Sequence, residues 1–139
     1  MCGIAGFTHF AGNMGDKVAL KKMGDSIYHR GPNAGGEYLD EHVGLAHRRL
    51  AIIDLSDAGI QPMTSHDGKY IIVFNGEIYN FQALRAELSA AGYPFKTHTD
   101  TEVILALYAT EGKNLLNKIN GMFAFALWDT TTQKLMIAR

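Results

Sequence analysis

The residue of this sequence best suited to covalent chemistry is Cys2, which is the only cysteine and directly follows Met1. Its small side chain is compatible with removal of Met1, which would leave a thiol and a free α-amine on one residue. The thiol could then attack a carbonyl carbon while the α-amine takes the proton, directly or through a water, with no histidine involved. The alternative, commoner for a lone cysteine, is a small buried residue of the first strand.

The dipeptide Asn75-Gly76 has residue types that could stabilise a developing negative charge. The N–H of Gly76 and the side-chain amide of Asn75 could together face an oxyanion, and losing one such donor typically costs about 2.7 to 4 kcal/mol of barrier. Asn-Gly is also a common tight-turn dipeptide, and it is expected here at the end of an apolar strand. The residue types alone leave both interpretations open.

Of three charged residues near these segments, only Arg49 has a side chain whose type by itself suits a small anionic ligand. Arg49, which follows Arg48 in a segment expected between two strands, could hold a carboxylate with its guanidinium fork. A pair of solvated surface charges is the alternative. Glu77 could be a surface charge, and Asp100 could simply favour the N-terminus of its helix.

The sequence argues against metal and nucleotide sites within this chain. The six histidines show no HExxH or comparable spacing and are interpreted as non-ligands. A single cysteine allows neither an internal disulfide nor a cysteine-based metal site. The glycine-rich segment 31–36 does not have a phosphate-loop pattern. We therefore expect no metal and no cofactor in this domain.

In the first half of the chain, the elements that must position these residues are mainly strands. Asp16 is expected to cap a helix whose apolar face is Leu20, Met23 and Ile27, after a loop at 12–15. The Gly-Pro at 31–32 predicts a loop over residues 29–33. Apolar runs and alternation predict strands over residues 2–10, 36–40, 43–47 and 50–55.

In the second half, helices and strands are predicted in groups. Residues 56–69 are expected to be irregular, and residues 70–74 a strand that ends at Asn75-Gly76. Asn80 is expected to cap a helix that Gly92 stops. Thr99 and Glu102 form a capping-box pattern at the start of a second helix, which should end near residue 112. Two final strands are predicted over residues 122–128 and 135–138, joined by a turn at 129–133.

Length and composition indicate one compact domain. The 139 residues are 47% hydrophobic, which is enough for a core, and carry a net charge of −1 without runs of like charge. Neither nucleic acid nor a membrane surface is therefore expected as a partner. No apolar stretch is as long as a membrane span and no signal peptide is recognisable, so a cytoplasmic location is expected.

The order of the expected elements predicts the fold class. Strands outnumber helices, and the helices do not alternate with strands, which favours an α+β fold of mainly antiparallel sheets with helices on their outer faces. The chain stops at Arg139, directly after a strand, so we expect it to be a fragment.

Several blocks along nearly the whole chain resemble one family, in order. The first residues, MCGIAGF, are similar to the start of class II glutamine amidotransferases, which are N-terminal-nucleophile hydrolases. The blocks that continue this resemblance are HRGP at 29–32, AHRRLAIID at 46–54 with QPM at 61–63, FNGEIYN at 74–80, TDTEV at 99–103 and GMFAF at 121–125. Within the class, NGEIYN and the HRRL and QPM pair resemble asparagine synthetases.

The resemblance implies a fold and a role for each site residue. The fold would be an αββα sandwich, with residues 1–139 forming a type 2 glutamine amidotransferase domain that lacks its end. Cys2 would be the nucleophile, and Asn75 with Gly76 the oxyanion hole. L-glutamine would be the substrate, held by its charged groups and by backbone; the residues implied in this binding are Arg49, Leu50, Ala51, Ile52, Ile53, Asn75, Gly76, Glu77 and Asp100.

The resemblance also implies partners that this chain does not contain. A C-terminal synthetase domain would bind ATP and Mg²⁺ and use the ammonia to make asparagine from aspartate, and a homodimer is left open. Two departures, Asn33 after HRGP where Asp is usual and Thr99 where Ser is frequent, keep hydrogen-bonding side chains. The rival interpretations are the same chemistry for another acceptor, such as a secondary metabolite or a cell-surface sugar, and a non-catalytic glutamine-sensing domain.

Overall fold

The structure, a computed structural model, describes residues 2–9, 16–50 and 59–139. Within these ranges the chain forms seven strands, three α-helices and two short 3₁₀ segments. In chain order they are β1 (Gly3–Thr8), α1 (Lys17–Ser26), η1 (Tyr28–Arg30), β2 (Ala34–Leu39), β3 (Val43–Arg49), β4 (Met63–Thr64), β5 (Tyr70–Ile78), α2 (Phe81–Ala90), α3 (Asp100–Glu111), η3 (Gly112–Asn117), β6 (Gly121–Asp129) and β7 (Lys134–Ala138).

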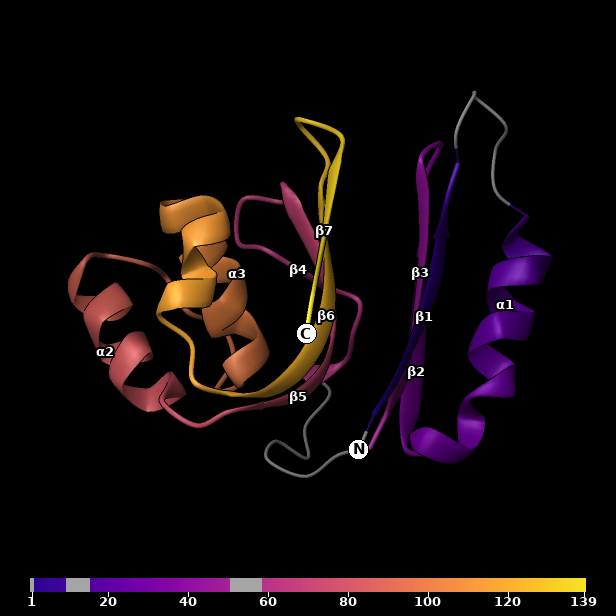
Figure 1. Ribbon diagram of the computed structural model, residues 1–139, viewed down its shortest axis with the longest axis horizontal. Helices are drawn as coiled ribbons and strands as arrows, with labels where there is room; N and C mark the ends of the chain where they lie inside the picture. The colour runs from indigo at the N-terminus through magenta and orange to yellow at the C-terminus, as the bar shows by residue number, and fades with distance from the viewer. Residues whose placement is uncertain (1, 10–15, 51–58) are drawn as a thin grey trace.

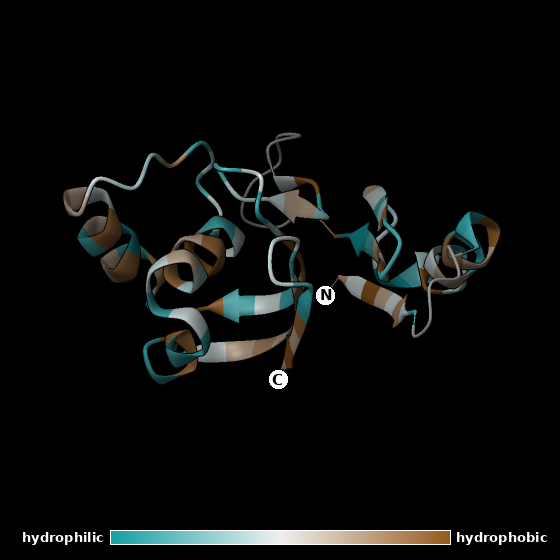
Figure 2. Ribbon diagram, turned by 90° about the horizontal axis from the view of Figure 1, so that it is seen from above, coloured by the Kyte–Doolittle hydropathy of each residue, from teal (hydrophilic) through white to brown (hydrophobic). Residues whose placement is uncertain are grey.

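Two antiparallel sheets stack face to face between layers of helix (Figure 1). One sheet has the strand order β1-β3-β2 and is covered on its outer face by α1. The other has the order β4-β5-β6-β7, and α2 and α3 cover its outer face (Figure 2). The α+β prediction, with mainly antiparallel sheets and outer helices, is confirmed.

Two apolar clusters hold these layers together. The larger lies between the second sheet and its helices, and α3 is buried so completely that every residue from 100 to 107 is inside. The smaller fills the space between the two sheets, with Val43 and Leu45 of β3 facing Val73 of β5 and Trp128 of β6. This inter-sheet cluster fixes the first sheet, which carries Cys2 and Arg49, relative to the second, which carries Asn75 and Gly76.

The hairpin end of the sandwich is tied by one carboxylate. Asp40, in the turn between β2 and β3, accepts hydrogen bonds from the Trp128 indole N–H at 2.7 Å and the Tyr38 hydroxyl at 2.9 Å. It also accepts from the backbone N–H groups of His42 and Val43. Since Trp128 belongs to the second sheet, Asp40 bonds the two sheets together at this end, which we call the tied end.

Several predicted element boundaries are wrong. The strand expected to end at residue 74 continues through Asn75-Gly76 to Ile78, because these residues pair with Ala124 and Phe123 of β6. Arg48 and Arg49 do not lie between two strands but complete β3. Residues 63–64 of the expected irregular stretch form β4, paired with Ile71 and Ile72. His29 and Arg30 of the expected loop lie in η1.

Helix starts were predicted with mixed success. Asp16 caps α1 as expected, accepting from the N–H of Val18 at 2.8 Å. Asn80 occupies the N-cap position of α2 as expected, but its side chain makes no capping bond, because its amide bonds the carbonyl of Lys118 and the N–H of Asn120. Thr99 does cap α3 through the N–H of Glu102.

The capping box at Thr99 is not reciprocal. The Glu102 carboxylate turns away from Thr99 and accepts from the backbone N–H groups of Lys96 and Thr97, at 2.8 and 2.6 Å. The N–H of Thr99 is instead taken by the Thr97 hydroxyl at 3.2 Å. Glu102 therefore fixes the loop before α3. The position at which α3 begins is fixed as a consequence.

The remaining expected elements are present, and their bounds lie within about two residues of the expectation where the structure describes them; the strands expected at 2–10 and 36–40, for example, are Gly3–Thr8 and Ala34–Leu39. Gly112 ends α3 with a φ of 56°, a value that suits glycine, and β6 and β7 form the predicted hairpin. Leu50 lies outside any strand, and the rest of the expected strand at 50–55, like the loop at 12–15, lies outside the described residues. No helix among residues 2–9, 16–50 and 59–139 is long and apolar enough to cross a membrane.

Candidate active site

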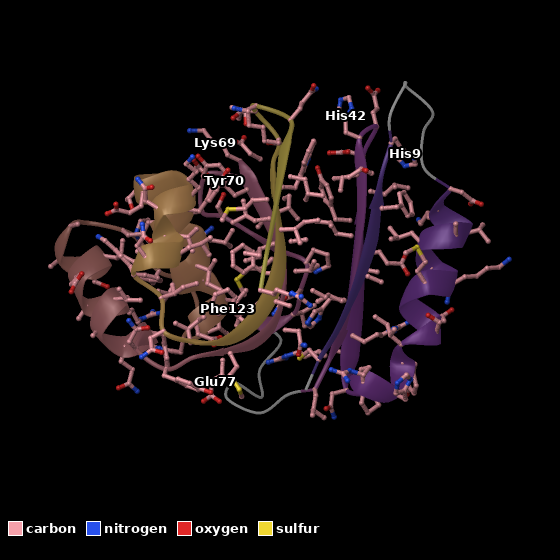
Figure 3. The ribbon with its side chains drawn as sticks, viewed as in Figure 1. His9, His42, Lys69, Tyr70, Glu77 and Phe123 are labelled. Carbon is pink, nitrogen blue, oxygen red and sulfur yellow. The ribbon has the colours of Figure 1, made fainter. Side chains whose placement is uncertain are left out.

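A cavity of about 150 Å³ opens at the end of the sandwich opposite the tied end. Figure 3 shows Glu77 at this lower end and His42 at the other. Thirteen described residues line the cavity: Cys2, Arg49, Leu50, Gly59, Gln61, Phe74, Asn75, Gly76, Glu77, Thr99, Asp100, Thr101 and Met122. The fold thus brings together every predicted site residue that the structure describes; Ala51, Ile52 and Ile53 lie outside the described residues.

Cys2 lies at the start of β1 with a half-buried free thiol. Its Sγ accepts from the N–H of Leu50 at 3.3 Å and lies 3.6 Å from the Leu50 carbonyl oxygen, to which the thiol can donate. The Cys2 carbonyl accepts from Nε and Nη2 of Arg30, each at 3.4 Å. Backbone on one side and an arginine on the other therefore hold the residue that carries the candidate nucleophile.

The edge of β5 presents a row of backbone donors to the cavity. In an antiparallel strand, N–H groups point alternately to the two sides, so those of Phe74, Gly76 and Ile78 share one side. The Phe74 N–H is bonded to the Gln61 side chain at 2.6 Å, and the Ile78 N–H to the Asp100 carboxylate at 3.0 Å. The Gly76 N–H lies between these two anchored positions, on the side of β5 that faces away from β6.

Gly76 has no room for a side chain. A Cβ atom at this position would collide with the Met122 carbonyl oxygen and lie 2.6 Å from the Cα of Phe123, both in the backbone of β6. The neighbouring Asn75 has a buried Oδ1 with no hydrogen-bond partner among the described residues. The dipeptide predicted as either a turn or an oxyanion site is therefore a strand segment in the cavity wall.

Arg49 brings a cation into the cavity wall. Its residue is only 7% exposed, so the guanidinium lies inside the domain rather than among solvated surface charges. Glycine at position 59 makes this possible, because a Cβ there would collide with Nη2 and lie 3.0 Å from Cζ of Arg49. Gly59 also lies beside Thr99, so the arginine reaches toward the start of α3.

Asp100 provides a buried carboxylate across the cavity. It is 5% exposed, and burial raises the pKa of its carboxyl group, an effect that the N–H groups of Ile78 and Thr101 oppose. The negative charge of the exposed Glu77 raises the same pKa further. A bound cation would relieve this repulsion, so the pair Glu77 and Asp100 suits a positively charged group.

The sequence placed Gln61 and Thr101 in matching blocks without giving them a role in the site, and it gave no signal for Gly59. Gln61 stands in the QPM block, and Thr101 follows Asp100, but no single-sequence pattern connects residues 40 positions apart. His47, in β3, is a buried histidine. It is 1% exposed, and burial lowers its pKa to about 4. Within the described ranges, no three His, Cys, Asp or Glu side chains gather as metal ligands.

The chain is similar to known proteins in both sequence and fold. A family model described as a glutamine amidotransferase domain matches residues 1–139. Asparagine synthetase [glutamine-hydrolyzing] 1 of Bacillus subtilis is 44% identical over 142 aligned residues, which cover 100% of this chain and 22% of that protein. Asparagine synthetase B of Escherichia coli is 44% identical over 89% of this chain and 23% of its own length.

The chain is also similar to proteins that are not named asparagine synthetases. The amidase chry2 of Gibberella zeae is 38% identical over 100% of this chain and 22% of its own length. Among solved structures, a B. subtilis glutamine phosphoribosylpyrophosphate amidotransferase superposes with a TM-score of 0.60 at 24% identity, covering 72% of this chain and 23% of that one. At this identity the superposition supports the fold alone. The chain spans about a fifth of the length of these curated relatives.

Proposed function

This chain belongs to the glutamine amidotransferase domain family, and from that premise we propose that it hydrolyses L-glutamine to glutamate and ammonia through a thioester on Cys2. The observation that carries the proposal is the composition of one cavity. A thiol, a strand-edge N–H, a buried guanidinium and a pair of carboxylates all line it. These groups match, one for one, the reactive amide carbon, its oxygen, the α-carboxylate and the α-ammonium of a free glutamine.

The reaction begins when the α-amine of Cys2 takes the proton of the thiol, directly or through a water, and the sulfur attacks the side-chain amide carbon. The carbonyl oxygen becomes an oxyanion, which the Gly76 N–H and the Asn75 side-chain amide stabilise. The α-amine of Cys2 passes a proton to the leaving nitrogen, the C–N bond breaks and ammonia departs. Water then gives a proton to the α-amine and attacks the thioester carbon. The C–S bond breaks, glutamate leaves, and the α-amine returns the proton to the sulfur.

In this proposal, charged residues bind the α-carboxylate and the α-ammonium of glutamine. Arg49 would bind the α-carboxylate, with backbone from Leu50 onward, including Ala51, Ile52 and Ile53, completing that side. Asp100 and Glu77 would bind the α-ammonium. Hydrogen bonds to charged groups contribute about 1.5–3 kcal/mol each, which favours a free amino acid over a glutamine within a protein.

The test is glutaminase activity of the protein with Met1 removed, measured as glutamate and ammonia released. Cys2→Ala should abolish turnover while leaving the thermal unfolding midpoint close to that of the wild-type protein. Intact mass must first show that Met1 is gone, because its retention blocks the α-amine. Full activity in Cys2→Ala would overturn the mechanism, whereas glutamine binding without turnover in the correctly processed protein would favour a glutamine sensor.

The destination of the ammonia is a wider part of the proposal. We infer that a synthetase domain continuous with this chain, holding ATP and Mg²⁺, uses the ammonia to convert aspartate into asparagine. The 44% identity with two asparagine synthetases supports this acceptor. We assign no residue of this chain to ATP or Mg²⁺. A cytoplasmic location fits these substrates, and a homodimer would be tested by sedimentation.

A second acceptor class also has support. The amidase chry2 of Gibberella zeae covers the whole chain at 38% identity, so similarity of this domain is compatible with a different amide product. Supplying the full-length protein with glutamine, ATP and aspartate should yield asparagine. Ammonia release without asparagine would favour the alternative acceptor while leaving the glutaminase proposal intact.

A further inference from the structure

Gln61 connects the two sides of the candidate site through a single side chain. It belongs to no helix or strand, yet it is only 5% exposed. Its Oε1 accepts from the Phe74 N–H at 2.6 Å, and its Nε2 donates to the Thr101 hydroxyl at 3.3 Å. One amide thus joins β5, directly before Asn75, to the first turn of α3, directly after Asp100.

The bond to Phe74 takes the place of a missing strand neighbour. β4 contains two residues and pairs only with Ile71 and Ile72, so no strand formed by the described residues lies beside the edge of β5 beyond residue 72. The Gln61 oxygen accepts from the first outward N–H of that edge, at Phe74. The Asp100 carboxylate accepts from the third, at Ile78.

The middle donor of this row is the one that the reaction needs. The Gly76 N–H lies between the two anchored groups and lines the cavity, and glycine at this position lets the strand lie flat against β6. Its direction depends on how β5 is held on both sides. Asp100 holds the far side and, through Gln61 and Thr101, both anchors share the start of α3.

We propose that Gln61 is a positioning residue for the oxyanion hole, an inference that rests on the proposed function. Its amide fixes the Phe74 peptide to α3, so that Asn75 and Gly76 aim at the reacting carbonyl oxygen. Gln61 acts through these residues and does not itself bind the oxyanion. Misplacement of a reacting group by about 1 Å can cost roughly 10²-fold in rate, so this constraint acts on the transition state.

The experiment compares Gln61→Leu, which keeps the size of the side chain but removes both bonds, with the wild-type protein. The matched control is Gln82→Leu, because Gln82 is exposed on α2. We expect kcat for glutamine hydrolysis to fall about 10- to 100-fold in Gln61→Leu, with KM changed less than about fivefold. The control should retain both constants.

An aldehyde analogue of glutamine gives a readout that general destabilisation would not move. The thiol adds to the aldehyde carbon, and the new C–O⁻ or C–OH oxygen occupies the oxyanion hole, with no leaving group required. Its inhibition constant should rise in Gln61→Leu by about the same factor as kcat falls. Inhibition by glutamate, which forms no tetrahedral adduct, should be unchanged.

Thr101 offers a second route if Gln61→Leu does not fold. Thr101→Val removes only the hydroxyl that anchors the Gln61 amide, and kcat should fall about three- to tenfold, whereas Thr101→Ser should restore it. Wild-type kcat in folded Gln61→Leu, or in Thr101→Val, would overturn the inference alone. Absence of turnover in the processed wild-type protein would overturn the proposed function, and this inference with it.

Discussion

The two ends of the sandwich are built from similar residues but are held in opposite ways. At the tied end, the Asp40 carboxylate accepts four hydrogen bonds and Asp129 accepts from the backbone and hydroxyl groups of Thr131 and Thr132. At the cavity end, the Asp100 carboxyl is buried with a raised pKa, and the Asn75 Oδ1 has no partner among the described residues.

The difference shows which end of the fold contains buried polar groups that lower the stability of the folded state. Carboxylates that are fully hydrogen-bonded stabilise a folded state, whereas buried groups without full compensation destabilise it unless a ligand completes them. The tied end should therefore control stability, and the cavity end should control turnover. Changes at each end test that division.

Gly76→Ala should have the largest effect, and at the cavity end. The added Cβ would push β5 away from the Met122 and Phe123 backbone and displace an oxyanion donor, so kcat should fall by at least about 10². Turnover kinetics with glutamine measure this. Gly92→Ala is the control, since a Cβ there meets nothing within 4 Å; its φ of 92° should cost about 1 kcal/mol of stability and no activity.

Asp40→Ala should act at the tied end alone. It removes the acceptor for Trp128, Tyr38 and two backbone N–H groups, and we expect the free energy of unfolding to fall by about 2–3 kcal/mol. Urea denaturation measures the loss. The kcat of the folded fraction should remain that of the wild-type protein, and a tenfold fall would mean that the two ends are coupled.

Arg49→Lys should separate binding from chemistry within the cavity end. Lysine keeps the charge but loses the two-pronged guanidinium, so KM for glutamine should rise about tenfold with kcat nearly unchanged. Arg85→Lys is the control, because the Arg85 guanidinium lies 4.1 Å from the centre of the Phe95 ring and Arg85 is not among the residues that line the cavity. An equal KM in Arg49→Lys would remove the carboxylate role from this residue.

The smallest expected effect is a pH dependence of opposite sign at the two ends. Hydrogen bonds lower the pKa of Asp129 to about 2, below its ordinary 3.8, so its contribution is present above pH 4 and is lost as pH falls from about 4 to 2. The raised pKa of Asp100 means that protonation there favours the folded state, so its cost diminishes as pH falls below that pKa.

Unfolding free energies of Asp129→Asn and Asp100→Asn across pH 2–7 would separate these signs. The wild-type advantage over Asp129→Asn should shrink toward pH 2. The excess stability of Asp100→Asn should shrink as pH falls below the raised pKa of Asp100. Parallel pH profiles for the two variants would contradict the contrast between the ends.

Much of the fold could be predicted because its signals are local. The Asp16 cap, the Thr99 cap, the stop at Gly112 and the hairpin of β6 and β7 depend on neighbours within a few positions. The predicted end of β5 at Asn75-Gly76 is wrong, because the local turn propensity of this dipeptide is outweighed by pairing with β6, a strand some 50 residues later. Asn80 stands at the predicted N-cap position, but its side chain bonds residues 118 and 120, which are distant in sequence, instead of the first turn of α2.

The residues of the candidate site also fall into two groups, those that the sequence predicted and those that only the fold reveals. Motif resemblance supplied Cys2, Arg49, Asn75, Gly76, Glu77 and Asp100, and the fold brings them to one cavity. It placed Gln61 and Thr101 in matching blocks but gave neither residue a role, because their role depends on hydrogen bonds that join a side chain to the edge of a strand and to a helix. Such bonds depend on β4 being two residues long, a property of the packed sheet that no window of sequence encodes.

The short β4 has a further consequence for the behaviour of the protein in concentrated solution. An uncovered strand edge is a template on which another chain can add a strand and begin to aggregate. Gln61 and Asp100 occupy the N–H groups of Phe74 and Ile78, so among the described residues only the Gly76 N–H of this stretch is left to receive an added strand. The side chains that leave one donor available for chemistry should thereby also make this edge of β5 a poor template for self-association.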